Sequence, residues 1–125
     1  MPDLTKMEAA IHEYVAAFDA GSADRVAALY AVDATCEDPI GSPVLHGREA
    51  IRAFYVESMK TGAKLKLEGP VRLAGDYAVF PFSVNLHWDG TDKRVDVIDT
   101  FRFNDDSEVT EMRAFWGPSN MHGFT

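Results

Sequence analysis

An acidic side chain, Asp99, stands in the middle of an apolar strand face. Residues 94–103 are rich in branched and aromatic side chains, which indicates a β-strand. Because successive side chains of a strand point to opposite faces, Asp99 shares its face with four apolar residues, Val95, Val97, Phe101 and Phe103. An ionised carboxylate is costly there, so we expect Asp99 to be salt-bridged or neutral. A salt bridge would make it structural, whereas a neutral acid in an apolar pocket could donate a hydrogen bond in catalysis.

A second acid, Asp38, ends a short run that also indicates a strand, just before Pro39. The same alternation places Asp38 with Ala34 and Cys36 on a mainly apolar face. An aspartate before proline commonly opens a turn, so Asp38 could instead cap the bend that follows.

Three tyrosines accompany the two acids on predicted inward faces. Tyr14 lies on the apolar stripe of the first predicted helix, and Tyr30 and Tyr55 lie on the inward sides of the next two. Each could be an ordinary core residue. Because buried polar groups need partners, we expect the phenols and acids to meet around a shared cavity.

The elements that must position these residues follow from the hydrophobic spacing. It predicts a long helix over residues 3–20, a short helix capped by Ser22 and a third helix over residues 48–60. Strands are predicted over residues 34–38, 63–67, 71–73, 77–88, 94–103 and 109–116. Helices followed by a run of hairpin strands predict an α+β domain, a curved antiparallel sheet packed on three helices around an apolar pocket.

The bulk properties exclude several classes of partner. At 125 residues the chain, residues 1–125, is expected to form a single domain. Its net charge of −8 argues against nucleic acid or an anionic membrane as a partner. No segment is long and apolar enough to span a membrane, the N-terminus has no signal-peptide pattern, and Cys36 is the single cysteine. We therefore expect a cytoplasmic protein.

Other kinds of chemistry have little support in the sequence. The four histidines are scattered without metal-ligand spacing, and no phosphate-binding loop or nucleophile elbow is present. Cys36 has no flanking base, so a small buried residue is the expected role. No metal site is predicted.

The order and spacing of the motifs resemble those of the bacterial Δ5-3-ketosteroid isomerases over essentially the whole chain. The segments that carry the resemblance are Ile11–Val15, Ala34–Gly41, His46–Glu49, Ile51–Tyr55 and Val97–Phe103. The resemblance implies a cone-shaped fold of the nuclear-transport-factor type, a homodimer and no cofactor.

The resemblance also implies a role for each inward polar residue. Asp38 resembles the general base, which moves a proton from C4 to C6 of a 3-oxo-Δ5-steroid. Tyr14 and protonated Asp99 resemble the donors to the dienolate oxygen, the division of roles already known for ketosteroid isomerases. Tyr30 and Tyr55 resemble a tyrosine network that supports Tyr14.

Five further residues would line the steroid site: Phe54, Phe82, Met112, Ala114 and Trp116. Two alternatives stay open, because a fold does not determine a function. One is another enzyme on the same fold, such as a polyketide cyclase or dehydratase. The other is a binding module whose inward acids are structural.

Overall fold

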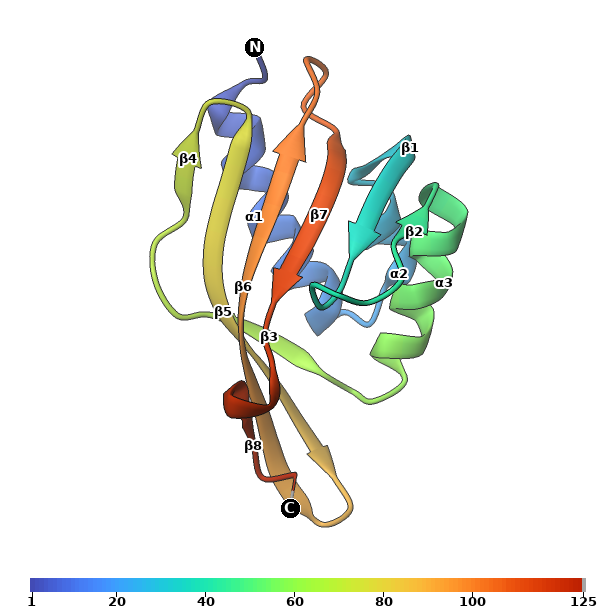
Figure 1. The fold of residues 1–125 in the computed structure, drawn as a ribbon, viewed down its shortest axis with the longest axis vertical. Helices are drawn as coiled ribbons and strands as arrows, with labels where there is room; N and C mark the ends of the chain where they lie inside the picture. The colour runs from blue at the N-terminus through green and yellow to red at the C-terminus, as the bar shows by residue number, and fades with distance from the viewer. Residues whose placement is uncertain (125) are drawn as a thin grey trace.

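The computed structural model of the protein describes residues 1–124. Its helices are α1 (Leu4–Asp19), α2 (Ala23–Ala27) and α3 (Arg48–Met59), with a short 3-10 turn η1 (Pro118–Asn120). Its strands are β1 (Tyr30–Glu37), β2 (Leu45–His46), β3 (Lys64–Leu67), β4 (Arg72–Ala74), β5 (Tyr77–Trp88), β6 (Thr91–Phe103), β7 (Val109–Phe115) and β8 (Met121–His122). One curved sheet packs against the helices (Figure 1), so the predicted α+β class is confirmed.

The sheet is mixed, whereas the sequence predicts an antiparallel one. Its strands run in the order β2-β1-β7-β6-β5-β3, with β4 on β5 and β8 on β6. Strands β5, β6 and β7 form antiparallel pairs, but β1 pairs with β7 in parallel. Hairpin turns fix the direction of neighbouring strands, whereas most of the chain separates β1 from β7 and leaves their relative direction free.

The first two helices begin where polar caps stand. The Asp3 side chain accepts the Lys6 backbone N–H at 3.1 Å, and the Ser22 side chain accepts the Arg25 N–H at 3.2 Å. These caps satisfy N–H groups that have no partner inside the helix, and so they set the first residues of α1 and α2.

Tyr30 lies in a strand, whereas the sequence predicts it on the short helix. Helix α2 ends at Ala27, and Tyr30 is the first residue of β1. The reason is tertiary: the Val109 N–H of β7 donates to the Leu29 carbonyl at 2.9 Å, and Tyr30 pairs with Val109. Sheet pairing therefore overrides the helical spacing, although Tyr30 remains fully buried.

The β6 strand alternates as its sequence predicts. Val97, Asp99 and Phe101 are buried, whereas the intervening Ile98 is 46 % exposed. Asp99 pairs with Phe80 on β5 and with Ala114 on β7. The acid thus lies at the centre of the sheet, on the face that packs against the helices.

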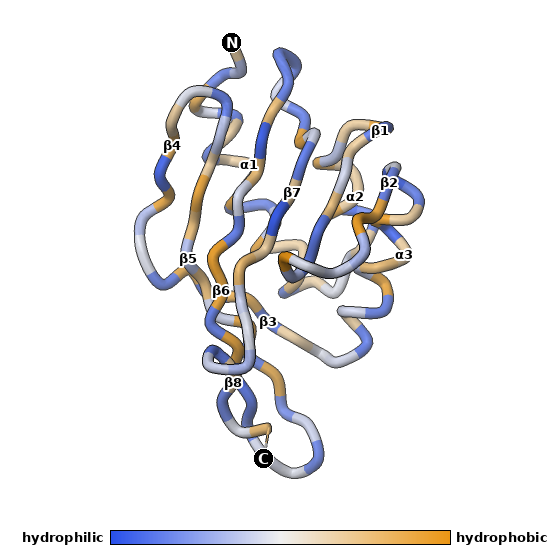
Figure 2. The backbone as a smooth tube through the Cα atoms, viewed as in Figure 1, coloured by the Kyte–Doolittle hydropathy of each residue, from blue (hydrophilic) through white to orange (hydrophobic). Residues whose placement is uncertain are grey.

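Beyond the body of the domain, β5 and β6 continue as a two-stranded arm beside β8 (Figure 1). The turn at its tip is hydrophilic, in contrast to the strands nearer the core (Figure 2). Within residues 1–124, no helix combines the length and apolar character needed to cross a membrane.

Candidate active site

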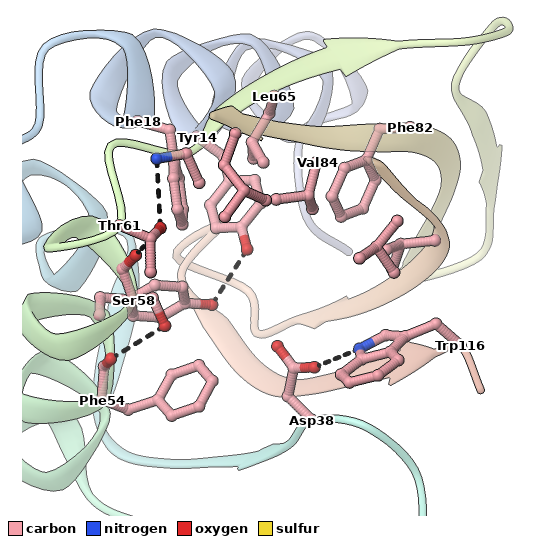
Figure 3. A pocket seen from close by; sticks show the side chains of 15 residues that line it. Tyr14, Phe18, Asp38, Phe54, Ser58, Thr61, Leu65, Phe82, Val84 and Trp116 are labelled. Atoms are coloured by element: carbon pink, nitrogen blue, oxygen red, sulfur yellow. Dashed lines mark hydrogen bonds between the residues drawn. The ribbon is translucent and has the colours of Figure 1, made fainter. Parts of the chain in front are cut away.

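A cavity of about 290 Å³ lies between the helices and the concave face of the sheet. Its walls are mostly apolar, and Figure 3 shows Tyr14 and Asp38 directed into it from different elements. The lining residues are Tyr14, Phe18, Asp38, Phe54, Tyr55, Ser58, Thr61, Ala63, Leu65, Phe82, Val84, Leu86, Val95, Val97 and Trp116. An apolar cavity with a few convergent polar groups is typical of a small-molecule site.

Tyr14 ends a chain of three buried phenols drawn from three elements. Its hydroxyl shares a hydrogen bond of 3.2 Å with Tyr55 of α3, and Tyr55 shares one of 2.8 Å with Tyr30 of β1. Burial raises the pKa of all three phenols well above the ordinary value. The Tyr14 hydroxyl therefore keeps its proton and remains a hydrogen-bond donor.

Asp99 lies next to Tyr14, just below the cavity wall. The Tyr14 ring packs against Phe80 at 6.2 Å and Phe101 at 5.2 Å between centroids. Phe80 is the cross-strand partner of Asp99, and Phe101 is two residues further along the same face. Asp99 itself is 1 % exposed and does not belong to the lining set.

The Asp99 carboxyl lacks any hydrogen-bond partner among residues 1–124, at either oxygen. The structural salt bridge considered for this residue is therefore absent from the described part of the chain. Burial raises the pKa of Asp99 well above its ordinary value, and the negative charge of Asp38 raises it further. The nearby Tyr14 hydroxyl lowers the pKa of Asp99, although it forms no hydrogen bond of good geometry with the carboxyl. Burial and the Asp38 charge both favour the protonated form of Asp99, close to the cavity.

Asp38 lies at the other polar position, directly after the last residue of β1. Its Oδ1 accepts the Trp116 indole N–H at 2.9 Å (Figure 3). Burial raises the pKa of Asp38, and the Trp116 hydrogen bond opposes that rise.

The turn after Asp38 is held by a different acid. The Gly41 N–H donates to the Glu37 side chain at 2.9 Å, and the Ile40 N–H donates to the Ala114 carbonyl, also at 2.9 Å. The turn-capping role considered for Asp38 therefore belongs to Glu37, and the Asp38 carboxylate is left facing the cavity.

Three of the five predicted wall residues line the cavity: Phe54, Phe82 and Trp116. Met112 and Ala114 differ from the expectation, because they are 0 % and 1 % exposed and pack in the core beneath the cavity. They point inward from β7 as predicted, but only beyond the end of this strand, at Trp116, does the chain reach the cavity.

Several lining residues were not anticipated from the sequence. Val84 and Leu86 continue the phase of Phe82 along β5, and Val95 and Val97 share the Asp99 face of β6, so strand alternation could have found them. Ser58 and Thr61, at the end of α3 and beyond it, carry no comparable signal. Within the described residues, no cluster of three or more potential metal-ligating side chains occurs.

Comparison with known proteins agrees with this architecture. The family model of the SnoaL-like domain matches residues 11–112. The solved structure of SalBIII, an epoxide hydrolase/cyclase-like enzyme in pyran ring formation in salinomycin, has a TM-score of 0.88 and covers 97% of this chain and 98% of its own. At 22% sequence identity this similarity shows the fold alone, and the family model shows that the chain belongs to the SnoaL-like domain family.

A relative with higher sequence identity indicates the class of activity. The Steroid Delta-isomerase of Nocardioides simplex is 40% identical over 117 residues, which are 93% of this chain and 94% of that protein. The chain is therefore an isomerase of the steroid Δ-isomerase family.

Proposed function

We propose that the protein converts 3-oxo-Δ5-steroids into 3-oxo-Δ4-steroids without a cofactor. A proton leaves C4, the electron pair is delocalised into a dienolate with its charge on the 3-oxygen, and the same proton is returned at C6. The double bond thereby moves from C5–C6 to C4–C5, with no net change in atoms or electrons. The observation that carries the proposal is the placement of Asp38 and Asp99, two carboxyls in opposite surroundings, around one apolar cavity.

Asp38 is the group that moves the proton. It is only partly buried, and the Trp116 N–H stabilises its ionised form, so a carboxylate is available near neutral pH. At the same time burial raises its pKa, which strengthens it as a base. A single carboxylate that serves both C4 and C6 must lie over the substrate, as a residue on the cavity wall does.

Tyr14 and Asp99 are the donors to the dienolate oxygen. Both are kept protonated by burial, and the Asp99 oxygens have no partner among residues 1–124. Buried polar groups are rarely left unbonded, so a ligand oxygen that accepts from Asp99 would account for this exception. Donors held in an apolar site stabilise developing negative charge much more strongly than water-exposed donors do.

We further propose that the protein acts as a homodimer that packs through the outer face of the sheet. Ile98 and Phe115 are cross-strand partners on that face, and they are 46 % and 45 % exposed. A pair of large apolar side chains exposed on the sheet surface favours burial against a second copy. Sedimentation equilibrium tests this arrangement, and a monomer would contradict it.

The activity itself is tested by an absorbance assay. Purified protein is mixed with a 3-oxo-Δ5-steroid, and the rise of the conjugated-enone absorbance is followed against a protein-free control. We expect turnover that requires neither metal nor cofactor and persists in the presence of a chelator. Absence of turnover with properly folded protein would overturn the proposal.

A further inference from the structure

The apolar face that lines the cavity continues along the β5–β6 arm and ends at a cation, Lys93. Val97 and Val95 line the cavity, and Lys93 is the next residue of β6 with the same orientation. The cross-strand partner of Lys93 is Leu86, which also lines the cavity. Along this face, Lys93 is therefore the first charged residue that a ligand meets as it extends away from Asp99.

Lys93 is held in place by neutral groups. Its ammonium donates to the Thr91 hydroxyl at 2.8 Å and to the Gly123 carbonyl at 2.9 Å, and it lies 5.4 Å from the centre of the Phe124 ring. No carboxylate of residues 1–124 lies within salt-bridge distance of it. The ammonium is thus oriented, and no acid of the described residues neutralises it.

The two neighbouring cations at this end of the sheet, Lys64 and Arg94, differ from Lys93 in the orientation of their side chains and in having acidic partners. Lys64 and Arg94 are cross-strand neighbours of Asn85 and have the opposite orientation to the cavity-lining residues. Each has an acidic partner, since Lys64 lies 4.0 Å from Asp19 and Arg94 lies 3.1 Å from Asp96. Among these three cations, Lys93 continues the cavity face, and it has no acidic partner within residues 1–124.

Distances along β6 indicate what could reach Lys93. At about 3.3 Å per residue, Val95 lies about 13 Å from Asp99, and Lys93 lies about 20 Å from it. A four-ring steroid skeleton that begins at the oxyanion donors is comparable in length to the first distance. The remaining two residues of strand correspond to a short aliphatic chain.

An apolar surface accompanies that last stretch. Trp88 has the same orientation as Leu86 on β5 and is 56 % exposed at the end of the arm. Methylene groups that leave the cavity past Leu86 would pass along this side of the arm on the way to Lys93.

We propose that the preferred substrate is a 3-oxo-Δ5-steroid whose C17 side chain ends in a carboxylate, and that Lys93 binds this carboxylate. The inference rests on the proposed function and adds a substrate class to it. Lysine is suited to this role, because its flexible stem places a point charge that attracts a carboxylate. The contact is remote from the reacting carbons, so it acts mainly on substrate binding.

The test compares two substrates that differ only in charge, a 3-oxo-Δ5-steroid with a C17 side-chain carboxylic acid and its methyl ester. We expect the wild-type enzyme to prefer the acid, with the difference in KM. In Lys93→Gln the ratio of kcat/KM for acid over ester falls about 5-fold, the effect of losing one partly exposed ion pair. Lys93→Arg retains the preference. The matched control is Arg94→Gln, which removes a charge from the adjacent residue on the opposite face and leaves the ratio unchanged.

The two proposals fail in different ways. A wild-type enzyme that turns over the ester but shows no preference for the acid would overturn the Lys93 proposal and leave the isomerase activity standing. An equal ratio in wild type and Lys93→Gln, or an equal loss in Arg94→Gln, would overturn it as well. If neither substrate, nor a neutral 3-oxo-Δ5-steroid without a side chain, is isomerised, the proposed function itself is wrong.

Discussion

The two polar regions of the cavity hold the same carboxyl group in different surroundings. Asp38 follows the last residue of β1, is partly exposed and accepts a hydrogen bond from Trp116. Asp99 lies inside β6, is 1 % exposed and has no partner among residues 1–124. Burial raises the pKa of both, and within residues 1–124 Asp38 accepts a hydrogen bond that opposes the rise, whereas Asp99 accepts none of good geometry.

The difference supports the proposed division of roles, in which Asp38 is the base and Asp99 the acid. The carboxyl at the strand end has a partner for its ionised form, whereas burial of the carboxyl in mid-strand favours its protonated form. The two states reinforce each other, because a charge on Asp38 further raises the pKa of Asp99. Substitutions of Asp38, Asp99 and Trp116 each remove one of the groups that make the two carboxyls differ.

Replacement of the base should have the largest effect. Asp38→Asn preserves the shape of the side chain but cannot accept a proton, and we expect kcat to fall about 100-fold to 10,000-fold. Stopped-flow or steady-state enone absorbance measures the loss. The matched control is Glu37→Gln, which changes the neighbouring acid that caps the turn and should keep most of the activity. Comparable losses in both variants would remove the base role from Asp38.

Replacement of Asp99 tests the donor at the other region. Asp99→Leu should lower kcat about 100-fold to 1,000-fold, the usual effect of one lost oxyanion donor. Asp99→Asn should lose less, since an amide N–H can still donate. Asp96→Asn, on the opposite face of the same strand, is the control and should remain active. If Asn and Leu at position 99 reduce activity equally in folded protein, Asp99 does not act as a donor.

The buried acid should also affect stability in a pH-dependent way. The unfolded chain releases the Asp99 proton near the ordinary pKa of about 4, whereas burial raises the folded pKa well above that value. Between the two values the unfolded state binds fewer protons, so stability is complete below pH 4 and falls as pH rises toward the folded pKa. Asp99→Asn should flatten this decline by about 1.4 kcal/mol per pH unit. Urea unfolding at several pH values measures it, and parallel curves for the two proteins would show that Asp99 ionises normally.

Removal of the Trp116 hydrogen bond should have the smallest effect. Trp116→Phe keeps an aromatic wall but takes away the donor that stabilises ionised Asp38, so the pKa of Asp38 should rise. The acid limb of the kcat/KM profile should then move to higher pH, with a loss of about 3-fold to 10-fold on that limb. An unchanged acid limb would mean that the indole contributes only to the wall.

Local periodicity predicts the features that depend on one element. Strand alternation places Asp99 among buried residues, and helical spacing places Tyr14 and Tyr55 inward, as the structure shows. In both cases the position of a side chain follows from the geometry of its own strand or helix. Tyr14 and Tyr55 line the cavity, and Asp99 lies just below its wall.

Features that depend on distant partners are harder to predict. Strand β1 pairs with β7 in parallel through backbone hydrogen bonds between segments that are far apart in the sequence. The same hydrogen bonds determine the strand conformation of Tyr30. Met112 likewise points inward as its strand predicts, but the residues packed above it decide that it lies in the core rather than at the cavity. The face to which a side chain points follows from its own strand or helix, whereas its depth below a cavity depends on residues from other elements.

The chain of phenols from Tyr14 through Tyr55 to Tyr30 imposes a direction on its protons. Each hydroxyl has one hydrogen to give, so a Tyr14 that donates to a ligand oxygen must receive from Tyr55, which must receive from Tyr30. All three hydroxyl rotors then point the same way, and each bond polarises the next. A ligand that accepts a hydrogen bond from Tyr14 therefore orients all three hydroxyl groups, from helix α1 to the start of strand β1.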